Sequence, residues 1–420
     1  MEIHDELTDA RARTLDLARD LDDAQWAGPR LSIVNPMRWE LGHIAWFQEL
    51  WTLRHARGAA PLRSDGDALY DSARVAHDTR WDLALPDRGA TLAYLAETLA
   101  RCLDGHQDAK GLYFQRLALF HEDMHGEAFT YTRQTLAYPA PTYATARLPG
   151  AGPLPGDVEV PGARYLLGAT EEEPFVFDNE KWAHPIDVKT FRIARAPVTN
   201  EEFLRFVAAR GYERRELWSD AGWQWRARAS ATHPVYWRAT GGAAFDERRY
   251  DRHGPLAPHQ PVVHVCAYEA DAYCRWAGRR LPSEAEWELA ASTAEKRRYP
   301  WGDEAPGAAH ANVDGRFGGP VDVAAFAAGD SAFGCRQMIG NVWEWTASDF
   351  APYPGFVIDP YKEYSEPWFA APHRVLRGGC WATRARLLRN TWRNFYPPDR
   401  RDVLAGFRTC AADGELAPSR

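Results

Sequence analysis

The sequence predicts an α+β protein of two domains, an N-terminal four-helix bundle and a C-terminal mixed domain. The chain has 420 residues, and a single hydrophobic core stops growing at about 250–300 residues. Apolar residues recur at helical spacing in residues 1–140, whereas residues 157–420 carry short, aromatic-rich runs between Gly and Pro turns. The Pro- and Gly-rich residues 141–156 are the expected linker between the two domains.

The N-terminal domain is expected to contain four helices and one long loop. Asn35 and Pro36 are typical of a helix start, with Asn35 as the cap and Pro36 in the first helical position. Residues 58–88 are rich in Gly, Asp and Arg and predict a long crossing loop. Four helices joined in this way favour a bundle. The expected helices cover residues 7–21, 36–50, 91–103 and 112–136.

The C-terminal domain is expected to be rich in irregular loops, with few helices. Residues 200–210 and 267–277 have helical spacing, and a short helix is expected at residues 283–291. Ser283 and Glu286 have the spacing of a capping box, in which each side chain bonds to the backbone N–H of the other residue. This spacing predicts that the short helix begins after Ser283.

Composition excludes several classes of protein. With 50 Lys and Arg against 58 Asp and Glu, the formal charge is −8, which disfavours a general nucleic-acid binder. No stretch is apolar enough for a membrane span, and the start of the chain lacks the pattern of a secretory signal. The six cysteines form no C-x-x-C motif, and reduced thiols are expected. A cytoplasmic protein is therefore expected, and its oligomeric state stays open.

The strongest local motif is a pair of histidines with metal-ligand spacing. Residues 121–125 read His-Glu-Asp-Met-His, so His121 and His125 project from the same face of a helix. This is formally the H-E-x-x-H pattern of zinc metalloproteases. The longer form of that motif is absent, because positions 128 and 131 are Ala and Tyr. The pair predicts a divalent metal site.

A third ligand is expected from another helix of the bundle. His43 lies in the apolar run from Leu41 to Phe47, where a histidine can also be a simple core residue. Metal sites in bundles are built from side chains on facing helices, and three histidines leave positions open on iron or zinc. Glu122 and Glu127 either orient these histidines or face solvent.

Four motifs of the C-terminal domain resemble the formylglycine-generating-enzyme (sulfatase-modifying-factor) family. They occur in the order of that family, at residues 278–288, 340–346, 377–381 and 406–408. The resemblance implies a modified C-type-lectin-like fold in which Trp287, Trp343 and Trp345 belong to the core. True formylglycine-generating enzymes bind copper through a cysteine pair, whereas Cys335 and Cys380 are isolated here.

The three histidines on a DinB-like bundle, followed by this domain, resemble the ergothioneine sulfoxide synthases and the selenoneine synthases. The resemblance covers nearly the whole chain. It implies a non-haem Fe(II) enzyme that uses O2 to attach sulfur or selenium to C2 of the imidazole ring of hercynine (trimethylhistidine). His43, His121 and His125 match the iron ligands of that family.

The resemblance also implies substrate-binding residues in the C-terminal domain, which is expected to form one wall of a cleft. Tyr361 matches the tyrosine that donates a proton or hydrogen, and Tyr364 matches one that helps to bind hercynine; Tyr353 is the alternative for the catalytic role. Asn394 matches a contact to the hercynine carboxylate. Phe395 replaces a tryptophan, and its ring can hold a quaternary ammonium group by cation–π attraction.

Departures from the family pattern bear on the sulfur or selenium donor. Family members that use γ-glutamylcysteine, which carries two carboxylates, hold it with clustered arginines and an Asp–Arg pair. Here Arg400 is kept, but Tyr396 stands at the position of the Asp, and Met124 replaces a Gln between the ligand histidines. A dianionic donor needs charge-assisted partners of this kind.

The loop at residues 69–86 favours a nearly neutral donor. It lacks the clustered arginines and resembles the selenoneine-synthase branch. Asp82, with Asp71 and Asp78, offers hydroxyl-binding groups, and Trp81 offers an apolar surface for a sugar ring. A plain solvated loop is the alternative. We therefore expect a selenosugar donor, with γ-glutamylcysteine or cysteine as the alternative.

Three other classes of function remain open from the residues alone. A zinc hydrolase would contain zinc and consume no O2. A DinB-like thiol transferase would share the three histidines without needing the C-terminal domain. A lectin-like binding module would leave the three histidines without a role.

Overall fold

The computed structural model describes residues 2–412, apart from residues 105–107, 144–145, 147–148 and 243. The chain divides into two compact units, residues 1–143 and residues 144–420. Part of the expected linker, residues 144–145 and 147–148, lies outside the described residues. Within the described part of the chain, no helix is both long and apolar enough to cross a membrane.

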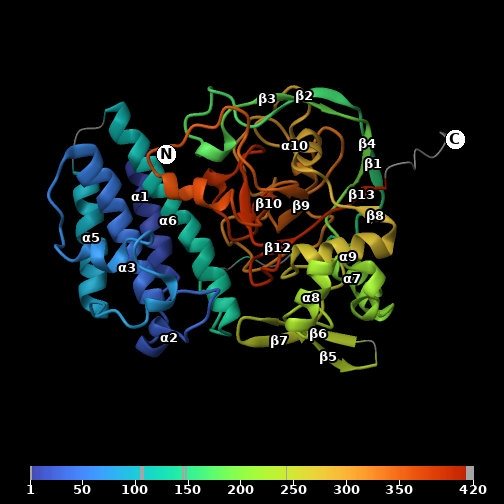
Figure 1. The fold of residues 1–420 in the computed structure, drawn as a ribbon, viewed down its shortest axis with the longest axis horizontal. Coiled ribbons are helices and arrows are strands. Elements are labelled where there is room, and N and C mark those ends of the chain that lie inside the picture. The colour runs from blue at the N-terminus through green and yellow to red at the C-terminus, as the bar shows by residue number, and fades with distance from the viewer. Residues whose placement is uncertain (1, 105–107, 144–145, 147–148, 243, 413–420) are drawn as a thin grey trace. The chain divides into compact units, whose positions relative to one another are not determined.

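The N-terminal unit is a helical bundle. Four long helices run side by side, and each packs against at least two of the others (Figure 1). The carboxylates of Asp87 and Asp108 cap two of these helices by accepting hydrogen bonds from backbone N–H groups of the first turn. The long helices are α1 (Ile3–Asp16), α3 (Met37–Gln48), α5 (Arg88–Leu103) and α6 (Ala109–Thr135), and α2 (Asp23–Ala27) is short.

Two details of the bundle differ from the sequence-based expectation. The first helix ends at Asp16, earlier than expected. Leu17 and Leu21 lie beyond the end of the helix but are buried, so their spacing resembles that of a longer helix. Pro36, rather than Asn35, is the N-cap of α3, and Asn35 does not cap it. The Asn35 amide instead bonds to two side chains, those of Arg80 and Glu40.

The loop at residues 58–88 contains short helices that the sequence did not reveal. These are α4 (Gly66–Tyr70) and the 3-10 helix η2 (His77–Thr79), and α3 continues before the loop as the π-helix η1 (Glu49–His55). The packing that orders the loop is long-range. Tyr70 is fully buried and lies so close to Gly42 that a Cβ there would be 2.2 Å from the Tyr70 ring. Gly42 is therefore required for this close approach.

The C-terminal unit is built from small, largely antiparallel sheets with helices packed on them, as the fold class predicts. One sheet has the order β1-β4-β13-β8, so the last strand pairs with β4, from near the start of the unit, and with β8. A second sheet has the order β11-β10-β9-β12, in which only the pairing of β12 with β9 is parallel. The strands are β1 (Asp157–Val160), β4 (Phe191–Ala194), β8 (Arg279–Arg280), β9 (Trp343–Asp349), β10 (Arg374–Arg377), β11 (Asn394–Tyr396), β12 (Ala405–Gly406) and β13 (Cys410–Ala411).

Two further sheets, four α-helices and several short 3-10 helices complete the described part of this unit. The Ser283 capping box is present as predicted, with the Ser283 side chain and the Glu286 carboxylate each bonded to the other's backbone N–H. The sheets comprise β2 (Ala163–Leu167) with β3 (His184–Val188), and β5 (Trp237–Gly241), β6 (Ala244–Arg249) and β7 (Arg252–Pro255). The helices are α7 (Asn200–Ala208), α8 (Asp220–Arg228), α9 (Ala267–Ala277) and α10 (Glu284–Ser292).

The motif tryptophans are core residues, as expected. Trp287, Trp343 and Trp345 have no exposed surface. The Trp287 indole N–H donates to the Glu344 carboxylate, which also pairs with the guanidinium of Arg408. The motif residues therefore form a buried, hydrogen-bonded core in this unit.

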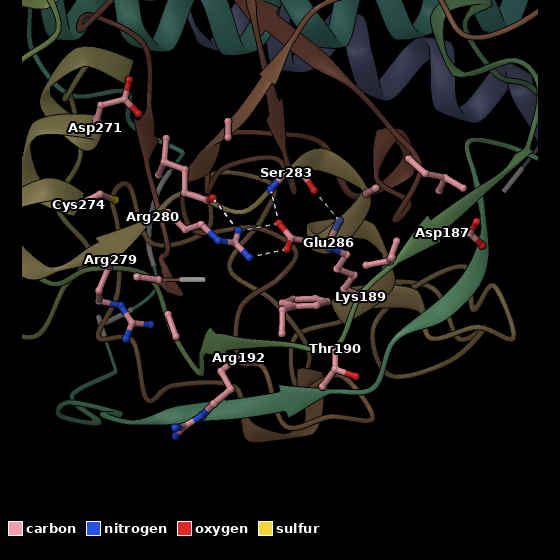
Figure 2. A pocket seen from close by; sticks show the side chains of 18 of the residues that line it. Asp187, Lys189, Thr190, Arg192, Asp271, Cys274, Arg279, Arg280, Ser283 and Glu286 are labelled. Carbon is pink, nitrogen blue, oxygen red and sulfur yellow. Dashed lines mark hydrogen bonds and ion pairs between the residues drawn. The ribbon is translucent and has the colours of Figure 1, made fainter. Parts of the chain in front are cut away.

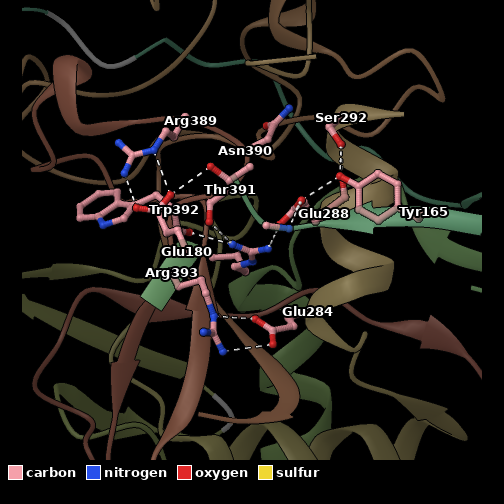
Figure 3. Close-up of polar contacts among 12 residues, drawn as sticks. Tyr165, Glu180, Glu284, Glu288, Ser292, Arg389, Asn390, Thr391, Trp392 and Arg393 are labelled. Carbon is pink, nitrogen blue, oxygen red and sulfur yellow. Dashed lines mark hydrogen bonds and ion pairs between the residues drawn. The ribbon is translucent and has the colours of Figure 1, made fainter. Parts of the chain in front are cut away.

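Buried arginine–carboxylate pairs join the strands and helices of the C-terminal unit (Figure 3). Arg393 donates to Glu284 at the start of α10, with 2.9 Å between Nε and Oε2. One turn later, Glu288 accepts from Arg377, from Lys296 and from the Tyr165 hydroxyl. Such buried ion pairs fix the geometry of the elements that carry them.

A buried histidine predicts how stability depends on pH. Burial lowers the pKa of His264 from its ordinary 6.5 to about 3, so the folded protein keeps His264 neutral while the unfolded chain takes up a proton near pH 6.5. Stability is therefore lost as pH falls from 6.5 toward 3, at about 1.4 kcal/mol per pH unit. In urea unfolding at pH 6 and pH 4, the wild type should lose about 2–3 kcal/mol more than a His264→Asn variant.

Asparagine suits this comparison because His264 has a positive φ of 61°, a conformation that Asn tolerates. Parallel stability curves for the two proteins between pH 6 and pH 4 would show that His264 does not set this dependence.

Candidate metal centre

Three histidines of the N-terminal unit converge on one point. His43 comes from α3, and His121 and His125 come from successive turns of α6. The Nε2 atom of His121 lies 3.2 Å from that of His43 and 3.3 Å from that of His125. One ligand atom from each residue lies within 4.8 Å of the others. The structure thus brings together the three residues that the sequence singled out as ligands.

Neighbouring groups fix the orientation of two of the rings. His43 Nδ1 lies 2.7 Å from the carbonyl oxygen of Tyr70, so Nδ1 carries the proton and Nε2 presents a lone pair. The Trp39 ring stacks on His43 at a centroid distance of 4.9 Å, and the Phe47 ring stacks on His121 at 3.6 Å. The lone pair of His43 therefore points at the other two histidines.

The electrostatics of the cluster favour a bound cation. Burial, and next the nearby His125, hold the pKa values of His43 and His121 well below 6.5, so both rings are neutral at pH 7. Ring nitrogens only 3.2–3.3 Å apart place lone pairs in a small space, an arrangement that a divalent transition metal stabilises. The donor set therefore fits iron(II) or zinc(II). The side chain of His125 is 17% exposed, so the histidine cluster is open to solvent at His125.

A carboxylate that the sequence analysis missed lies behind His125. Glu40 is buried, and its Oε1 atom is 3.5 Å from His125 Nδ1. The signal was present, since Glu40 and His43 form the Glu-x-x-His spacing that bundle metal sites use. Glu40 is therefore placed to orient His125.

The two glutamates considered in the sequence do not face solvent, so that alternative is wrong. Glu122 and Glu127 are both buried. Glu122 pairs with Arg11, with 2.8 Å between Oε1 and Nε, and Arg11 also donates to Gln48. Because a zinc protease needs this glutamate as a general base beside the metal, its ion pair with Arg11 argues against that class.

Comparisons with known proteins identify the family. Residues 6–135 match the DinB superfamily, and residues 145–413 match the sulfatase-modifying factor enzyme 1-like domain. The chain is 40% identical to a hercynine oxygenase of Mycolicibacterium thermoresistibile, over 97% of this chain and 94% of the relative. It is 39% identical to a hercynine oxygenase of Mycobacterium tuberculosis, over 96% of each chain. The chain belongs to the hercynine oxygenase family. It is accordingly an enzyme.

The hercynine oxygenase family shares its C-terminal domain with a second group of enzymes. A formylglycine-generating enzyme of Streptomyces coelicolor is 34% identical to this chain, over 67% of this chain and 98% of that protein. That similarity leaves about a third of the chain unmatched. Cys335 and Cys380 are both buried, and burial raises the pKa of the Cys335 thiol to about 11, so that thiol stays protonated.

The predicted tyrosines of the C-terminal unit have different surroundings. Tyr361 and Tyr364 lie with ring centroids 6.1 Å apart, and Tyr364 stacks on Phe177 at 4.1 Å. Tyr353 is buried, its hydroxyl lies 3.3 Å from Glu284, and the guanidinium of Arg393 covers its ring. Burial raises the pKa of Tyr353 well above 10. Tyr353 thus resembles a core residue more than a proton donor.

The next group of predicted residues lies on and after strand β11. Asn394 Oδ1 accepts a hydrogen bond from the backbone N–H of Phe395, and the Phe395 ring stacks on Phe350 at 3.9 Å. Arg400 forms a two-pronged ion pair with Asp402, at 2.7 and 2.6 Å. The guanidinium of Arg400 is thus already neutralised within the chain.

The remaining predicted residues lie in the N-terminal unit. Met124 is half-buried on α6 beside His125. Trp81 donates from its indole N–H to the carbonyl of Gly28, and the exposed Asp82 pairs with Arg30. Trp81 and Asp82 therefore share one surface with the segment around residues 28–30.

A hollow of about 800 Å³ in the C-terminal unit holds none of the predicted substrate residues (Figure 2). Arg280 and Glu286 pair across it with 2.7 Å between Nη2 and Oε1. Arg279 is also neutralised, because it pairs with Asp157. The hollow therefore adds no residue to the candidate site.

Proposed function

We propose that the chain is an Fe(II)-dependent hercynine oxygenase that attaches selenium from a selenosugar to C2 of the hercynine imidazole. The observation that carries the proposal is the cluster of three converging histidines, two of them held neutral by burial, in a chain about 40% identical to hercynine oxygenases over nearly its full length. His43, His121 and His125 are the proposed ligands, and iron held by them would supply the O2 chemistry.

The overall reaction balances with O2 as the oxidant. The hydrogen on C2 of hercynine and the hydrogen on the donor selenium leave with one oxygen atom as water. The other oxygen atom oxidises the selenium in the newly formed C–Se unit. Hydrolysis of the bond between that selenium and the sugar would then release the sugar with a hydroxyl group and leave a selenenic acid on the hercynine ring.

Residues of the C-terminal unit are proposed to bind hercynine and move a proton. Asn394 would hold the carboxylate through its amide N–H group. The aromatic faces of Phe395 and Tyr364, whose centroids are 6.3 Å apart, would hold the trimethylammonium group by cation–π attraction. Tyr361, which is half-buried, would deliver the proton. Met124 would line the hercynine pocket beside His125.

The contacts of the loop arginines favour a neutral donor. Arg63, Arg74 and Arg88 each pair with an aspartate, and Arg80 is buried. Arg400 is the residue that favours the alternative donor, γ-glutamylcysteine or cysteine and hence C–S bond formation, but its charge is neutralised by Asp402. A dianion would have to break these pairs in order to bind, whereas a selenosugar would not.

The donor assignment predicts a selective effect of Trp81→Ala. Because Trp81 would stack on the sugar, its loss should raise KM for a selenosugar about tenfold, equivalent to about 1.4 kcal/mol, and leave KM for hercynine unchanged. Steady-state O2 uptake with each substrate varied in turn measures this.

The matched control is Trp223→Ala, which removes a half-buried tryptophan of the C-terminal unit. Equal KM values for the selenosugar in the Trp81 variant and the wild type would remove Trp81 from the donor site. Turnover with γ-glutamylcysteine alone would overturn the selenium assignment and leave the iron-dependent oxygenase.

A further inference from the structure

The loop at residues 58–88 carries a buried cation close to the metal centre. Arg80 is only 8% exposed. Its Nη1 donates to Asn35 Oδ1 at 2.7 Å, and its Nη2 donates to the carbonyl of Val75 at 3.3 Å. Burial lowers the pKa of Arg80 to about 10, so it remains a cation at pH 7. A buried arginine is rare unless its contacts require it.

One set of contacts leads from Arg80 to His43. The guanidinium carbon lies 3.7 Å from the centroid of the Trp39 ring. Trp39 in turn stacks on His43, with ring centroids 4.9 Å apart and an angle of 10° between the ring planes. A planar guanidinium suits such stacking, whereas an ammonium does not. Arg80 thus packs on Trp39, which packs on the ring of His43, one of the proposed ligands.

A second set of contacts leads from Arg80 to His125. Asn35 accepts from Arg80 with its oxygen and donates from Nδ2 to Glu40 Oε1 at 3.0 Å. The same carboxylate oxygen lies 3.5 Å from His125 Nδ1. Asn35 therefore connects a cation of the loop to the carboxylate behind a second proposed ligand.

We propose that Arg80 is a positioning residue that sets the orientation of His43 through Trp39 and of His125 through Asn35 and Glu40. The inference rests on the proposed function, in which these histidines hold a metal. It gives the loop a role at this site, because the loop supplies both Arg80 and the Tyr70 carbonyl that orients His43. Outer contacts of this type hold metal-binding histidines in the geometry that binds the ion.

The test uses the full chain loaded with Co(II) and without substrate. Arg80→Met keeps the length of the side chain but removes the charge and the planar group. We expect Co(II) affinity to fall at least tenfold and the visible ligand-field bands of bound Co(II) to shift. Arg80→Lys keeps the positive charge but loses the planar guanidinium with its paired N–H donors. Its Co(II) affinity should therefore lie between those of Arg80→Met and the wild type. Arg74→Met, in the same loop and exposed, should match the wild type.

The results distinguish a role of Arg80 in positioning the histidines from a role in binding substrate. If Arg80 instead bound a substrate carboxylate, the Met variant would leave the Co(II) bands and affinity unchanged and alter only KM, which overturns the proposal. If Arg80→Met does not fold, Asn35→Ala removes the connection between Arg80 and Glu40, keeps the contact of Arg80 with Trp39, and should still shift the bands. Unchanged bands in that variant would also overturn the proposal. A wild type that binds neither Co(II) nor Fe(II) would contradict the proposed function itself.

Discussion

Replacing His121 by alanine is expected to abolish metal binding and hercynine-dependent O2 consumption. His121 is the central member of the cluster, since its Nε2 atom contacts the Nε2 atoms of both His43 and His125. Without it, the two remaining histidines no longer form a three-ligand site. Metal content after anaerobic loading should fall from near one ion per chain to below about a tenth of that value, and turnover by at least about a thousandfold.

Thermal stability gives a second measurement of the same change. A metal at 100 times its Kd stabilises the folded state by about 2.7 kcal/mol, so adding Co(II) should raise the Tm of the wild type and leave that of His121→Ala unchanged. His253→Ala, an exposed histidine of the C-terminal unit, is the matched control and should behave as the wild type. Full turnover by metal-free His121→Ala would refute the assignment of the ligands.

Replacing Arg408 by methionine is expected to lower the free energy of unfolding of the C-terminal unit by about 3–5 kcal/mol. Arg408 and Glu344 are both buried, with 2.7 Å between Nη2 and Oε1. Arg408 also donates to the carbonyl of Arg336. The variant leaves the Glu344 carboxylate in the core without its cation, and that uncompensated charge accounts for most of the loss. Urea unfolding followed by tryptophan fluorescence measures the change.

A double variant separates the loss of a contact from the burial of an unpaired charge. Arg408→Met together with Glu344→Leu should recover much of the lost stability, because replacing both members of a buried pair by apolar residues is often nearly neutral. Arg205→Met breaks an exposed pair and should change stability by less than about 1 kcal/mol. Equal losses in the single and double variants would show that the charge is not responsible.

The cluster of three histidines could be predicted from the sequence because its signal is local. His121 and His125 share a helix face through their i, i+4 spacing, and the bundle places a facing helix opposite them. Glu40 also had a local signal, its spacing from His43. Arg80 and the Tyr70 carbonyl had none, because both reach the site through the fold of a loop that looks merely polar in sequence.

In the C-terminal unit too, some features could be predicted from the sequence and others could not. Its motifs predicted the fold class and the buried tryptophans, because those residues are specific to one fold. The ion pair of Arg400 with Asp402, two residues away, could have been considered from the sequence, yet its formation depends on the turn between β11 and β12. The core position of Tyr353 depends on Arg393 and Glu284, which are distant in sequence.

The most direct test of the proposed function follows the hydrogen on C2 of hercynine. The protein, either loaded with Fe(II) or free of metal, is incubated with hercynine carrying deuterium at C2 and a selenosugar, with and without O2, and the products are identified by mass. The proposed function predicts a product that has lost the deuterium and gained selenium, formed only when both Fe(II) and O2 are present. Hercynine that keeps its deuterium under all conditions, with either a selenosugar or γ-glutamylcysteine as the donor, would contradict it.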